Sequence, residues 1–497
     1  MAIFDTAMDN LLDAYAPGVP VLTDGVTALD ADQVRARVAQ VCAALAARRW
    51  PEAPVAILAD NGPGWLVADL ATQQLGVTLV PLPLFFTPAQ WHHVLMESGC
   101  TALLCALPEQ AAALGFGAQS LLTGPLGLYE AATRAGGAAL DATQKITFTS
   151  GTTSSPKGVC LDADQQWQLA GALQRGLAGL QLQRHLCLLP FSVLLENIAG
   201  PYTALLSGAT VICPPLAETG LSGASQFDPQ RCLAAIARYQ AQSIIVLPQM
   251  LQALVAVTAD HDPRLASLRF VAVGGARTPP RLLQAARARG IPVFEGYGLS
   301  ECCSVVALNL PGSERVGSVG RPLPHRPVRI AADGEIEVGG RAGHYLGQAP
   351  AAAVGSWLAT GDLGHLDADG FLHIDGRKKD VLITGYGRNV SPEWPESALL
   401  GSGAFAAVVV VGDAMPYLGA LLVPVSAALT PEQLAAAVAL ANRDLPDYAQ
   451  VRRWRVVPPW GPATGLSTAN GRPRRAAIAR HYATDIAALY DNLEHIA

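Results

Sequence analysis

The stretch TFTSGTTSSPKGV, residues 147–159, decides how the rest of the chain is interpreted. It is rich in hydroxyl side chains, has no acidic residue and carries one cation, Lys157, after a proline. Residues 144–148 could form a strand, whereas the Gly, Ser, Thr and Pro that follow are typical of a loop. The loop is either an ordinary surface turn or a phosphate-binding loop of backbone N–H groups, hydroxyls and a lysine. It is not a Walker loop, because residues 151–157 do not give GxxxxGK[ST], and by itself it leaves both interpretations open.

The composition describes a well-buried globular protein. The chain has 497 residues, of which 51% are hydrophobic and 15% charged, and its formal net charge is −6. Because this length exceeds what one hydrophobic core usually supports, two or more domains are expected. There is no basic stripe, so nucleic-acid binding is not expected. The apolar runs are too short to span a bilayer, so no integral membrane segment is expected either.

The N-terminal residues and the cysteines favour a cytoplasmic protein. The first residues include acidic side chains and no early cation, unlike a secretory signal. The nine cysteines are scattered without CxxC pairs. The adjacent Cys302 and Cys303 are expected to be buried small hydrophobes rather than a metal or redox site. We therefore expect a reducing cytoplasm.

The order of apolar segments predicts an α/β fold. Short aliphatic runs alternate with segments of helical spacing, as in parallel strands joined by helices. After residue 316, β-like pieces with Asp-Gly turns at 333–334 and 369–370 indicate hairpins. A smaller α/β unit begins near residue 380, so we expect two domains, 1–378 and 379–497. Strands are expected at residues 55–58, 77–80, 185–189, 210–212, 243–246, 270–273, 328–330, 335–338, 371–374, 406–411, 419–425 and 451–457, and helices at 28–50, 65–75, 88–97, 229–239 and 431–442.

Four further motifs carry candidate chemistry. In EGYGLSE, residues 295–301, two glycines would let the backbone approach a planar ligand on which Tyr297 stacks, and Glu301 is a hard oxygen ligand suited to magnesium. In TGDLG, residues 360–364, Asp362 could accept hydrogen bonds from a ribose, although alone this motif is typical of an Asx turn. The other two motifs, each weak by itself, are DGRKKDVLITGYGRNVSPE at 375–393 and TANGRPRR at 468–475.

Taken in order, the motifs resemble the adenylate-forming superfamily of acyl-CoA synthetases, peptide synthetase adenylation domains and luciferases. The resemblance extends from about residue 28 to residue 475 and is closest to long-chain acyl-CoA synthetases. It includes VPLPLFFTPAQ (80–90), VGGARTP (273–279), GSVGRPLP (317–324) and GEIEVGG (334–340). It implies an α/β fold with a large N-terminal domain of parallel α/β layers and a β-rich part, followed by a small mobile α/β C-terminal domain.

The resemblance implies conversion of a carboxylic acid and Mg-ATP into an acyl adenylate, followed by transfer of the acyl group to a thiol of CoA or of a carrier protein's phosphopantetheine. Lys157, Glu301 and Arg472 are the implied catalytic residues, with Glu301 holding magnesium. The implied ligand-binding residues are Thr149, Ser150, Gly151, Thr152, Thr153 and Lys157 at the terminal phosphates, Gly275 and Ala276 beside the adenine and acyl pocket, Glu295, Gly296, Tyr297 and Gly298 around the adenine, Ser300 at the α-phosphate, Asp362 and Arg377 at the ribose, Lys379 at the hinge between the domains, and Gly387 along a pantetheine tunnel.

The physical chemistry of adenylation agrees with these roles. A carboxylate attacks a phosphate, so neutralising charge and aligning the reactants is most of the catalytic task. The carboxylate is already ionised near pH 7, so no general base is required.

Arg472 departs from the family pattern, which has a lysine at this position that bridges carboxylate and phosphate. Arginine keeps the charge, but its planar fork does not replace a compact ammonium. Either Arg472 performs the lysine's task, or a neighbour such as Arg474 does, or adenylation is slow or lost. We favour the first, because a positive charge remains at the expected place.

The segment LPFSVLLENIAG, residues 189–200, indicates the type of acid. It offers no aspartate to pair with an amino acid's ammonium, and burying an unpaired ammonium is costly. We therefore expect an apolar acid. The segments RNVSPEW (388–394) and LPDYAQVRRW (445–454) most resemble long-chain acyl-CoA synthetases, and this resemblance implies a medium or long fatty acid rather than an aryl acid. Two alternatives remain: an enzyme that uses the adenylate without thiol transfer, for instance to close a β-lactone, and a nucleotide- or acyl-binding protein whose chemistry is impaired at Arg472.

Overall fold

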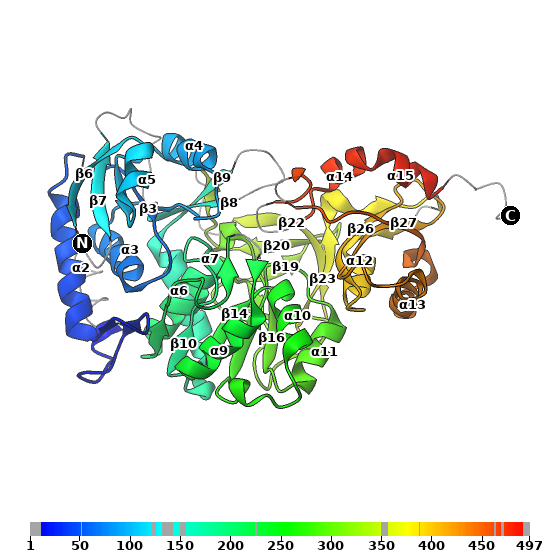
Figure 1. Ribbon diagram of the computed structural model, residues 1–497, viewed down its shortest axis with the longest axis horizontal. Helices are drawn as coiled ribbons and strands as arrows, with labels where there is room; N and C mark the ends of the chain where they lie inside the picture. The colour runs from blue at the N-terminus through cyan, green and yellow to red at the C-terminus, as the bar shows by residue number, and fades with distance from the viewer. Residues whose placement is uncertain are drawn as a thin grey trace.

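The structure is a computed structural model that describes residues 11–490, apart from residues 51, 122–125, 132–142, 150–155, 224–225, 349–355, 387, 462–463 and 469–471. Its largest sheet has nine strands (Figure 1). In spatial order they are β18 (Arg321–Pro322), β17 (Ala307–Leu308), β16 (Val293–Tyr297), β15 (Phe270–Val273), β14 (Ser243–Val246), β10 (Arg184–Leu186), β11 (Thr210–Ile212), β1 (Leu22–Thr23) and β2 (Ala28–Leu29). The strands from β16 to β1 run parallel. All four residues of β14 are buried, as expected for a central parallel strand covered on both faces.

A second sheet of eight strands forms most of the N-terminal part of the chain, drawn in blue and cyan in Figure 1. In spatial order its strands are β21 (His344–Tyr345), β9 (Lys157–Leu161), β8 (Lys145–Thr149), β4 (Leu79–Pro81), β3 (Val55–Leu58), β5 (Ala102–Cys105), β7 (Gly127–Ala131) and β6 (Phe116–Leu121). The middle strands β8, β4, β3 and β5 run parallel, and antiparallel strands close both edges.

Helices pack against these sheets, and several begin at residues that suit a helix N-terminus. Asp30, Thr87 and Thr430 each form a capping box with a glutamine three residues later. The α-helices are α2 (Ala31–Ala46), α3 (Pro63–Leu75), α4 (Pro88–Ser98), α5 (Pro108–Ala113), α6 (Ala163–Leu177), α7 (Leu194–Asn197), α8 (Thr203–Leu206), α9 (Pro229–Tyr239), α10 (Pro248–Val257), α11 (Pro280–Ala288), α12 (Glu393–Leu400), α13 (Pro431–Asn442), α14 (Arg475–His481) and α15 (Ala483–Ala488). One π-helical turn, η2 (Ile198–Tyr202), continues α7 into α8.

A buried ion pair links the second sheet to α3 and to the segment from α7 to η2. The Lys145 Nζ atom of β8 donates to Asp69 Oδ2 of α3 at 3.0 Å and to the Tyr202 hydroxyl of η2 at 2.9 Å. Asn197, at the end of α7, also bonds to both charged groups. Burial lowers the pKa of Lys145, and the neighbouring Asp69 opposes this shift. The side chains of Lys145 and Asp69 are each 1% exposed, so their charges depend on each other.

Four smaller sheets complete the fold of the described residues. Two of them have two strands each: β12 (Leu221–Ser222) with β13 (Gln226–Phe227), and β24 (Leu382–Ile383) with β25 (Asn389–Val390). The β-rich part of the N-terminal domain is a four-stranded sheet in the order β19 (Val328–Ile330), β20 (Glu335–Gly339), β22 (Trp357–Leu366) and β23 (Leu372–Arg377). The C-terminal unit, drawn from yellow through orange to red in Figure 1, contains β26 (Phe405–Val411), β27 (Leu418–Pro424) and β28 (Val451–Val456) in that order, and lies beside β23. The interface between the two parts includes an ion pair of Arg281 Nη2 with Asp444 Oδ2 at 2.6 Å.

The predicted fold class is confirmed: an α/β protein with a large N-terminal domain and a smaller C-terminal domain. Most predicted elements form within two or three residues of their expected bounds, and helix 229–239 and strand 243–246 form as predicted. Two expectations need correction. Residues 157–159 are not loop, because Lys157 begins β9 and pairs with Thr149 across a hairpin. The long helix expected at 28–50 begins only at Ala31, since residues 28–29 form an edge strand.

Cys302 and Cys303 are both buried and free, as predicted. Within the described part of the chain, no helix is both long and apolar enough to cross a membrane.

Candidate active site

A cavity of about 950 Å³ opens at the carboxyl ends of the central parallel strands. Strands β14, β15 and β16 end side by side there, as is usual for ligand sites in parallel α/β sheets. Ten of the residues implied by the motifs line it: Thr149, Gly275, Ala276, Gly296, Tyr297, Gly298, Ser300, Glu301, Arg377 and Arg472. The fold therefore brings together motifs that are separated by more than 300 residues in the sequence.

Tyr297 and Arg377 are held in the cavity wall by Asp362. The Tyr297 hydroxyl donates to Asp362 Oδ2 at 2.6 Å, and Arg377 Nε lies 2.8 Å from Asp362 Oδ1. Burial raises the pKa of Asp362, and the nearby Arg377 opposes this shift. Asp362 lies in the long strand β22, so the interpretation of TGDLG as an Asx turn is wrong. Its carboxylate orients two side chains that face the cavity.

Glu301 is positioned by a tyrosine that the sequence did not single out. The Tyr345 hydroxyl donates to Glu301 Oε1 at 2.6 Å. Tyr345 lies in β21, which pairs with β9 opposite Val159, and the Lys157 Nζ atom is 5.9 Å from the centre of the Tyr345 ring. Glu301 therefore bonds to the hydroxyl of Tyr345, and the Lys157 ammonium lies over the ring of the same residue. A carboxylate in this position is chemically suited to Mg²⁺.

Glu295 and the motif glycines shape the backbone beside Tyr297. The Glu295 carboxylate accepts a hydrogen bond from the Thr278 backbone N–H at 3.0 Å, which fixes the loop that follows Gly275. Burial raises the pKa of Glu295 to about 7. A Cβ atom on Gly298 would lie 1.4 Å from the Ser304 carbonyl oxygen, so only glycine fits there. Glu295 and Gly298 thus fix the backbone that forms this part of the cavity wall.

Arg472 reaches the cavity from the C-terminal unit. Its Nη2 atom donates to the Gly275 carbonyl, and Thr468 folds back on it through two hydrogen bonds, of 2.8 Å and 3.1 Å. Although the residue keeps part of its surface exposed, desolvation and the nearby Arg377 lower the pKa of its guanidinium. Arg472, which stands where the family pattern has a lysine, therefore lies beside the other motif residues.

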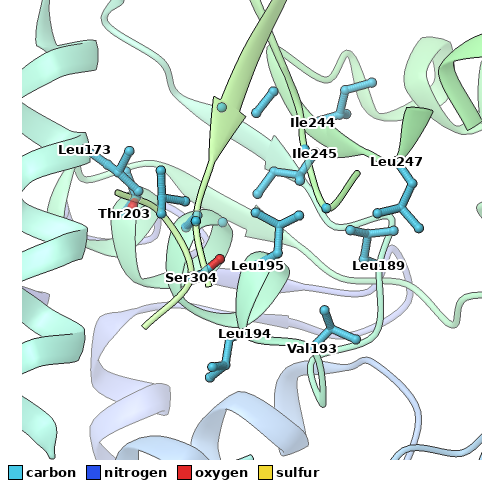
Figure 2. Close-up of a pocket in the computed structure, with 18 of the residues that line it drawn as sticks. Leu173, Leu189, Val193, Leu194, Leu195, Thr203, Ile244, Ile245, Leu247 and Ser304 are labelled. Atoms are coloured by element: carbon cyan, nitrogen blue, oxygen red, sulfur yellow. The ribbon is translucent and has the colours of Figure 1, made fainter. Parts of the chain in front are cut away.

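The apolar side of the cavity runs between the central sheet and helices α6, α7 and α8. Figure 2 shows side chains of α6, α7 and β14 around one space, among them Leu173, Leu195 and Ile245. No acidic side chain lies among the residues of this wall, which include Leu173, Leu177, Leu189, Val193, Leu194, Leu195, Ile245 and Leu247. Val193, which precedes α7, also lines the cavity.

Family models of AMP-binding enzymes match this chain over most of its length. The model of the main domain matches residues 13–344, and the model of the C-terminal domain matches residues 379–494. The chain belongs to the AMP-binding enzyme family. The predicted resemblance to adenylate-forming enzymes is thereby confirmed.

Several characterised proteins resemble this AMP-binding enzyme. It is 34% identical over 252 residues to the long-chain-fatty-acid–CoA ligase FadD15 of Mycobacterium bovis, but this covers 45% of the chain and only 42% of that ligase. It is 30% identical to the feruloyl-CoA synthase of an Amycolatopsis species, over 81% of the chain and 84% of that enzyme. The structure of the O-succinylbenzoate–CoA synthetase of Bacillus subtilis with AMP gives a TM-score of 0.74 at 25% identity, covering 94% of this chain and 97% of that one.

Parts of the predicted site fall outside the described residues. These are Ser150, Gly151, Thr152 and Thr153 of the first motif, and Gly387. The ends of the first motif are described: Thr149 lines the cavity, and Lys157 pairs with it. Lys379 lies in a short 3₁₀ turn, 378–380, next to Lys378, whose Nζ atom pairs with Asp333 and Glu335 of the N-terminal domain at 2.6 Å and 2.7 Å.

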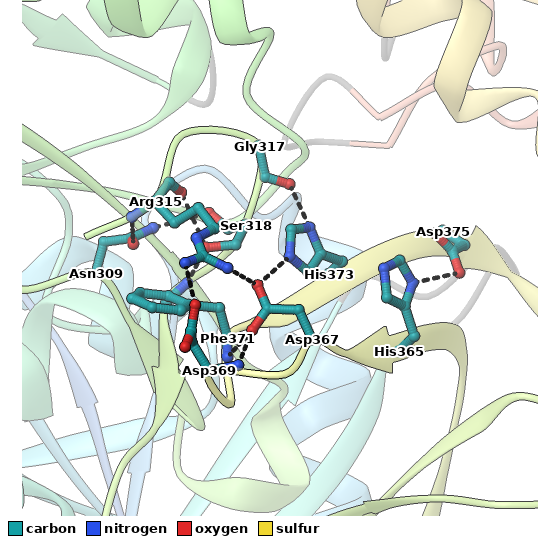
Figure 3. A network of polar contacts seen from close by, with 11 residues as sticks. Asn309, Arg315, Gly317, Ser318, His365, Asp367, Asp369, Phe371, His373 and Asp375 are labelled. Atoms are coloured by element: carbon teal, nitrogen blue, oxygen red, sulfur yellow. Dashed lines mark hydrogen bonds and ion pairs between the residues drawn. The ribbon is translucent and has the colours of Figure 1, made fainter. Parts of the chain in front are cut away.

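A surface network supports the hairpin that carries Asp362 and Arg377 in this AMP-binding enzyme (Figure 3). Arg315 pairs with Asp367 and with Asp369, the latter at 2.6 Å, in the turn between β22 and β23. His373 bonds to Asp367 at 3.1 Å and to the Gly317 carbonyl at 3.1 Å. Arg315, and Gly317 at the start of the GSVG motif, therefore support this hairpin.

Proposed function

We propose that this AMP-binding enzyme activates a carboxylic acid with ATP to an acyl adenylate and transfers the acyl group to a thiol. The observation that carries the proposal is the continuous cavity, which connects Tyr297, Glu301 and Arg472 to an apolar interior. A nucleotide bound beside Tyr297, Glu301 and Arg472 would place its α-phosphate within reach of an acid that occupies the apolar interior. The CoA ligases among its relatives support the same reaction.

In this proposal, each of the described site residues binds a different part of the reactants. Arg472 neutralises the attacking carboxylate and the α-phosphate, and Lys157 attracts the departing pyrophosphate. Tyr297 stacks on the adenine, while Arg377 and Asp362 hold the ribose. Ser300 donates to the α-phosphate. Glu301 would hold Mg²⁺, which supplies further neutralisation of phosphate charge.

The acid is apolar over most of its length, because leucine, isoleucine and valine side chains line the interior. An ammonium or second carboxylate among them would be desolvated without a charged partner. A fatty acid of medium or long chain fits this wall better than a flat aryl acid, and CoA or a carrier-protein phosphopantetheine is the thiol.

The decisive experiment is ATP–pyrophosphate exchange with a panel of carboxylic acids. Exchange with fatty acids, and AMP release that requires added CoA, is the expected result. AMP release without any thiol would favour the alternative in which the adenylate reacts otherwise; an amide bond synthetase of Marinactinospora thermotolerans is among the similar structures, at 25% identity. ATP binding without exchange would favour an impaired binding protein.

The second half-reaction requires the C-terminal domain, residues 379–497, to rotate about Lys379. Arg472 lines the cavity in the present arrangement, whereas Tyr386, in the segment next to Gly387, is 79% exposed and does not line it. A Lys379→Pro change fixes one backbone dihedral of the hinge. It is expected to leave exchange within threefold of wild type and to slow thioester formation at least tenfold. Lys379→Ala removes the same charge, keeps the hinge free and should slow neither step by more than threefold; equal rates in both variants would contradict the hinge.

A further inference from the structure

The cavity runs the whole length of the central strands, and its two ends differ in polarity. At the carboxyl end of β14, Leu247 packs close to Gly275: a Cβ atom added to Gly275 would lie 3.0 Å from Leu247 Cδ2. At the other end, β14 begins with Ser243, and His185 of β10 is its partner in register. Ser243 and His185 both line the cavity although they are only 6% and 5% exposed. Gln183 and Ser207 add further polar lining there.

Ser243, His185 and Glu196 form one chain of hydrogen bonds. The Ser243 Oγ and His185 Nδ1 atoms are 3.0 Å apart, as are His185 Nε2 and Glu196 Oε1. The second Glu196 oxygen accepts the backbone N–H groups of Leu188 and Leu189 at 3.1 Å and 2.8 Å. A carboxylate only accepts, so His185 donates through Nε2, and in its neutral form it accepts from Ser243 through Nδ1. The Ser243 oxygen then has only lone pairs left to offer.

The absence of a side chain at Gly200 leaves space for this chain of hydrogen bonds. A Cβ atom on Gly200 of η2 would lie 2.5 Å from His185 Nε2 and 2.6 Å from Glu196 Oε1. The helix can approach the pair only because residue 200 is glycine. Buried polar groups that are fully bonded to one another hold a single geometry, which suits the recognition of one ligand group.

Recognition of a ligand group explains this chain of hydrogen bonds better than catalysis or metal binding does. Its order is that of a hydrolase triad, but Ser243 lies four residues from Leu247, which is about 13 Å along a strand, too far to attack the activated carboxyl group. Cys187, together with His185 and Glu196, could surround a metal ion. However, burial raises the pKa of the Cys187 thiol well above its usual range, and Glu196 is already bonded to two N–H groups.

We infer that the acid substrate carries a hydroxyl group at the end remote from its carboxyl group, and that Ser243 accepts a hydrogen bond from that hydroxyl. The inference rests on the proposed function and narrows its substrate class from a plain fatty acid to a hydroxy acid. A saturated chain would leave the buried Ser243 lone pairs unpaired, whereas a terminal hydroxyl satisfies them. One such bond is expected to favour the hydroxy acid about tenfold.

The test compares terminally hydroxylated octanoic, decanoic and dodecanoic acids with their unsubstituted counterparts in ATP–pyrophosphate exchange. For the best-fitting length, kcat/KM for the hydroxy acid should exceed that for the plain acid about tenfold. Ser243→Ala should bring this ratio close to one. Ser98→Ala, which removes another buried serine hydroxyl that bonds only within α4 and its end, should leave the ratio unchanged.

The outcomes separate the inference from the proposed function. Exchange with both series at a wild-type ratio near one, or a high ratio that Ser243→Ala leaves intact, overturns the inference and keeps the proposed function. Absence of exchange with every acid overturns both. The wild-type ratio needs no variant, so it decides the matter even where Ser243→Ala does not fold.

Discussion

Arg472 is the residue at which the sequence departs furthest from its family and at which the structure gives the clearest prediction. Its guanidinium lies against the Gly275 carbonyl at the cavity mouth, where acid and α-phosphate would meet. Arg472→Ala should lower the rate of ATP–pyrophosphate exchange about 100-fold, as expected when one charge-stabilising donor is removed. Arg472→Lys should match or exceed the wild-type rate.

Matched arginine variants identify the residue that supplies this charge. Arg480→Ala removes an exposed arginine of α14 and should leave exchange unchanged. If Arg474→Ala is the slow variant and Arg472→Ala is not, the neighbouring arginine has taken over the lysine's task.

Glu295 gives a prediction about pH. Its pKa is raised from 4.5 to about 7 in the folded state, so the folded protein binds the proton more tightly than the unfolded chain. Protonation of Glu295 therefore adds to the free energy of unfolding. This contribution is fully present below pH 4.5 and is lost as the pH rises through 7. Between pH 5 and pH 8, wild type should lose roughly 2–3 kcal/mol more than Glu295→Gln, which does not titrate.

Denaturant unfolding of the two proteins at several pH values measures this difference. Glutamine keeps an oxygen for the Thr278 N–H, so the variant tests the charge rather than the hydrogen bond. Parallel pH profiles for the two proteins would show that Glu295 is ionised throughout.

At the residue scale, the sequence identified side chains that belong to motifs and missed those that support them. Tyr297, Glu301 and Arg377 were found because their motifs resemble a family. Tyr345 was missed because it lies in an edge strand with no motif, and its contact with Glu301 depends on the pairing of β21 with β9. Asp362 was found, but its local sequence could not show that it lies within a ten-residue strand.

At the scale of elements, the link between β16 and the short turn that follows depends on Gly298. A Cβ atom there would overlap the Ser304 backbone, which cannot rotate away as a side chain can. Gly298→Ala should destabilise the protein by about 1–3 kcal/mol through overpacking, and should displace Ser300 and Glu301 enough to lower exchange at least tenfold.

Gly179→Ala is the matched control, because a Cβ atom at residue 179 meets nothing within 4 Å. Thermal unfolding and exchange assays on both variants test the prediction. A Gly298→Ala protein with wild-type values in both assays would mean that the Ser304 segment moves without cost.

Element types were more predictable than their partners. Helix 229–239 follows an Asp-Pro start and an amphipathic run, so its local signals agree. Sheet order has no such local signal: β1 pairs with β11 through Leu22 and Val211, nearly 190 residues apart. The helix Ala163–Leu177 was not predicted, although Asp162 caps it by accepting a hydrogen bond from the Gln165 backbone N–H.

At the scale of the whole molecule, the buried ion pair of Lys145 and Asp69 joins β8, the strand that carries Thr149, to α3 and, through Asn197, to α7 beside the cavity. Lys145→Met would leave the Asp69 carboxylate buried without a cation, which is expected to cost about 3–5 kcal/mol. Exchange should also fall, since β8 and α7 would no longer be held to each other. The unfolding midpoint and the exchange rate of the same preparation measure both effects.

The double variant Asp69→Asn with Lys145→Met separates a lost charge balance from lost packing. It removes both charges and keeps an amide oxygen for the Tyr202 hydroxyl, so it should recover at least half of the lost stability. The recovery follows because the cost of the single change is mainly an uncompensated charge in a dry interior. A single variant as stable as wild type would show that water reaches Asp69. A double variant no more stable than the single one would show that the contact of β8 with α3 and α7 depends on the shape of the lysine side chain instead.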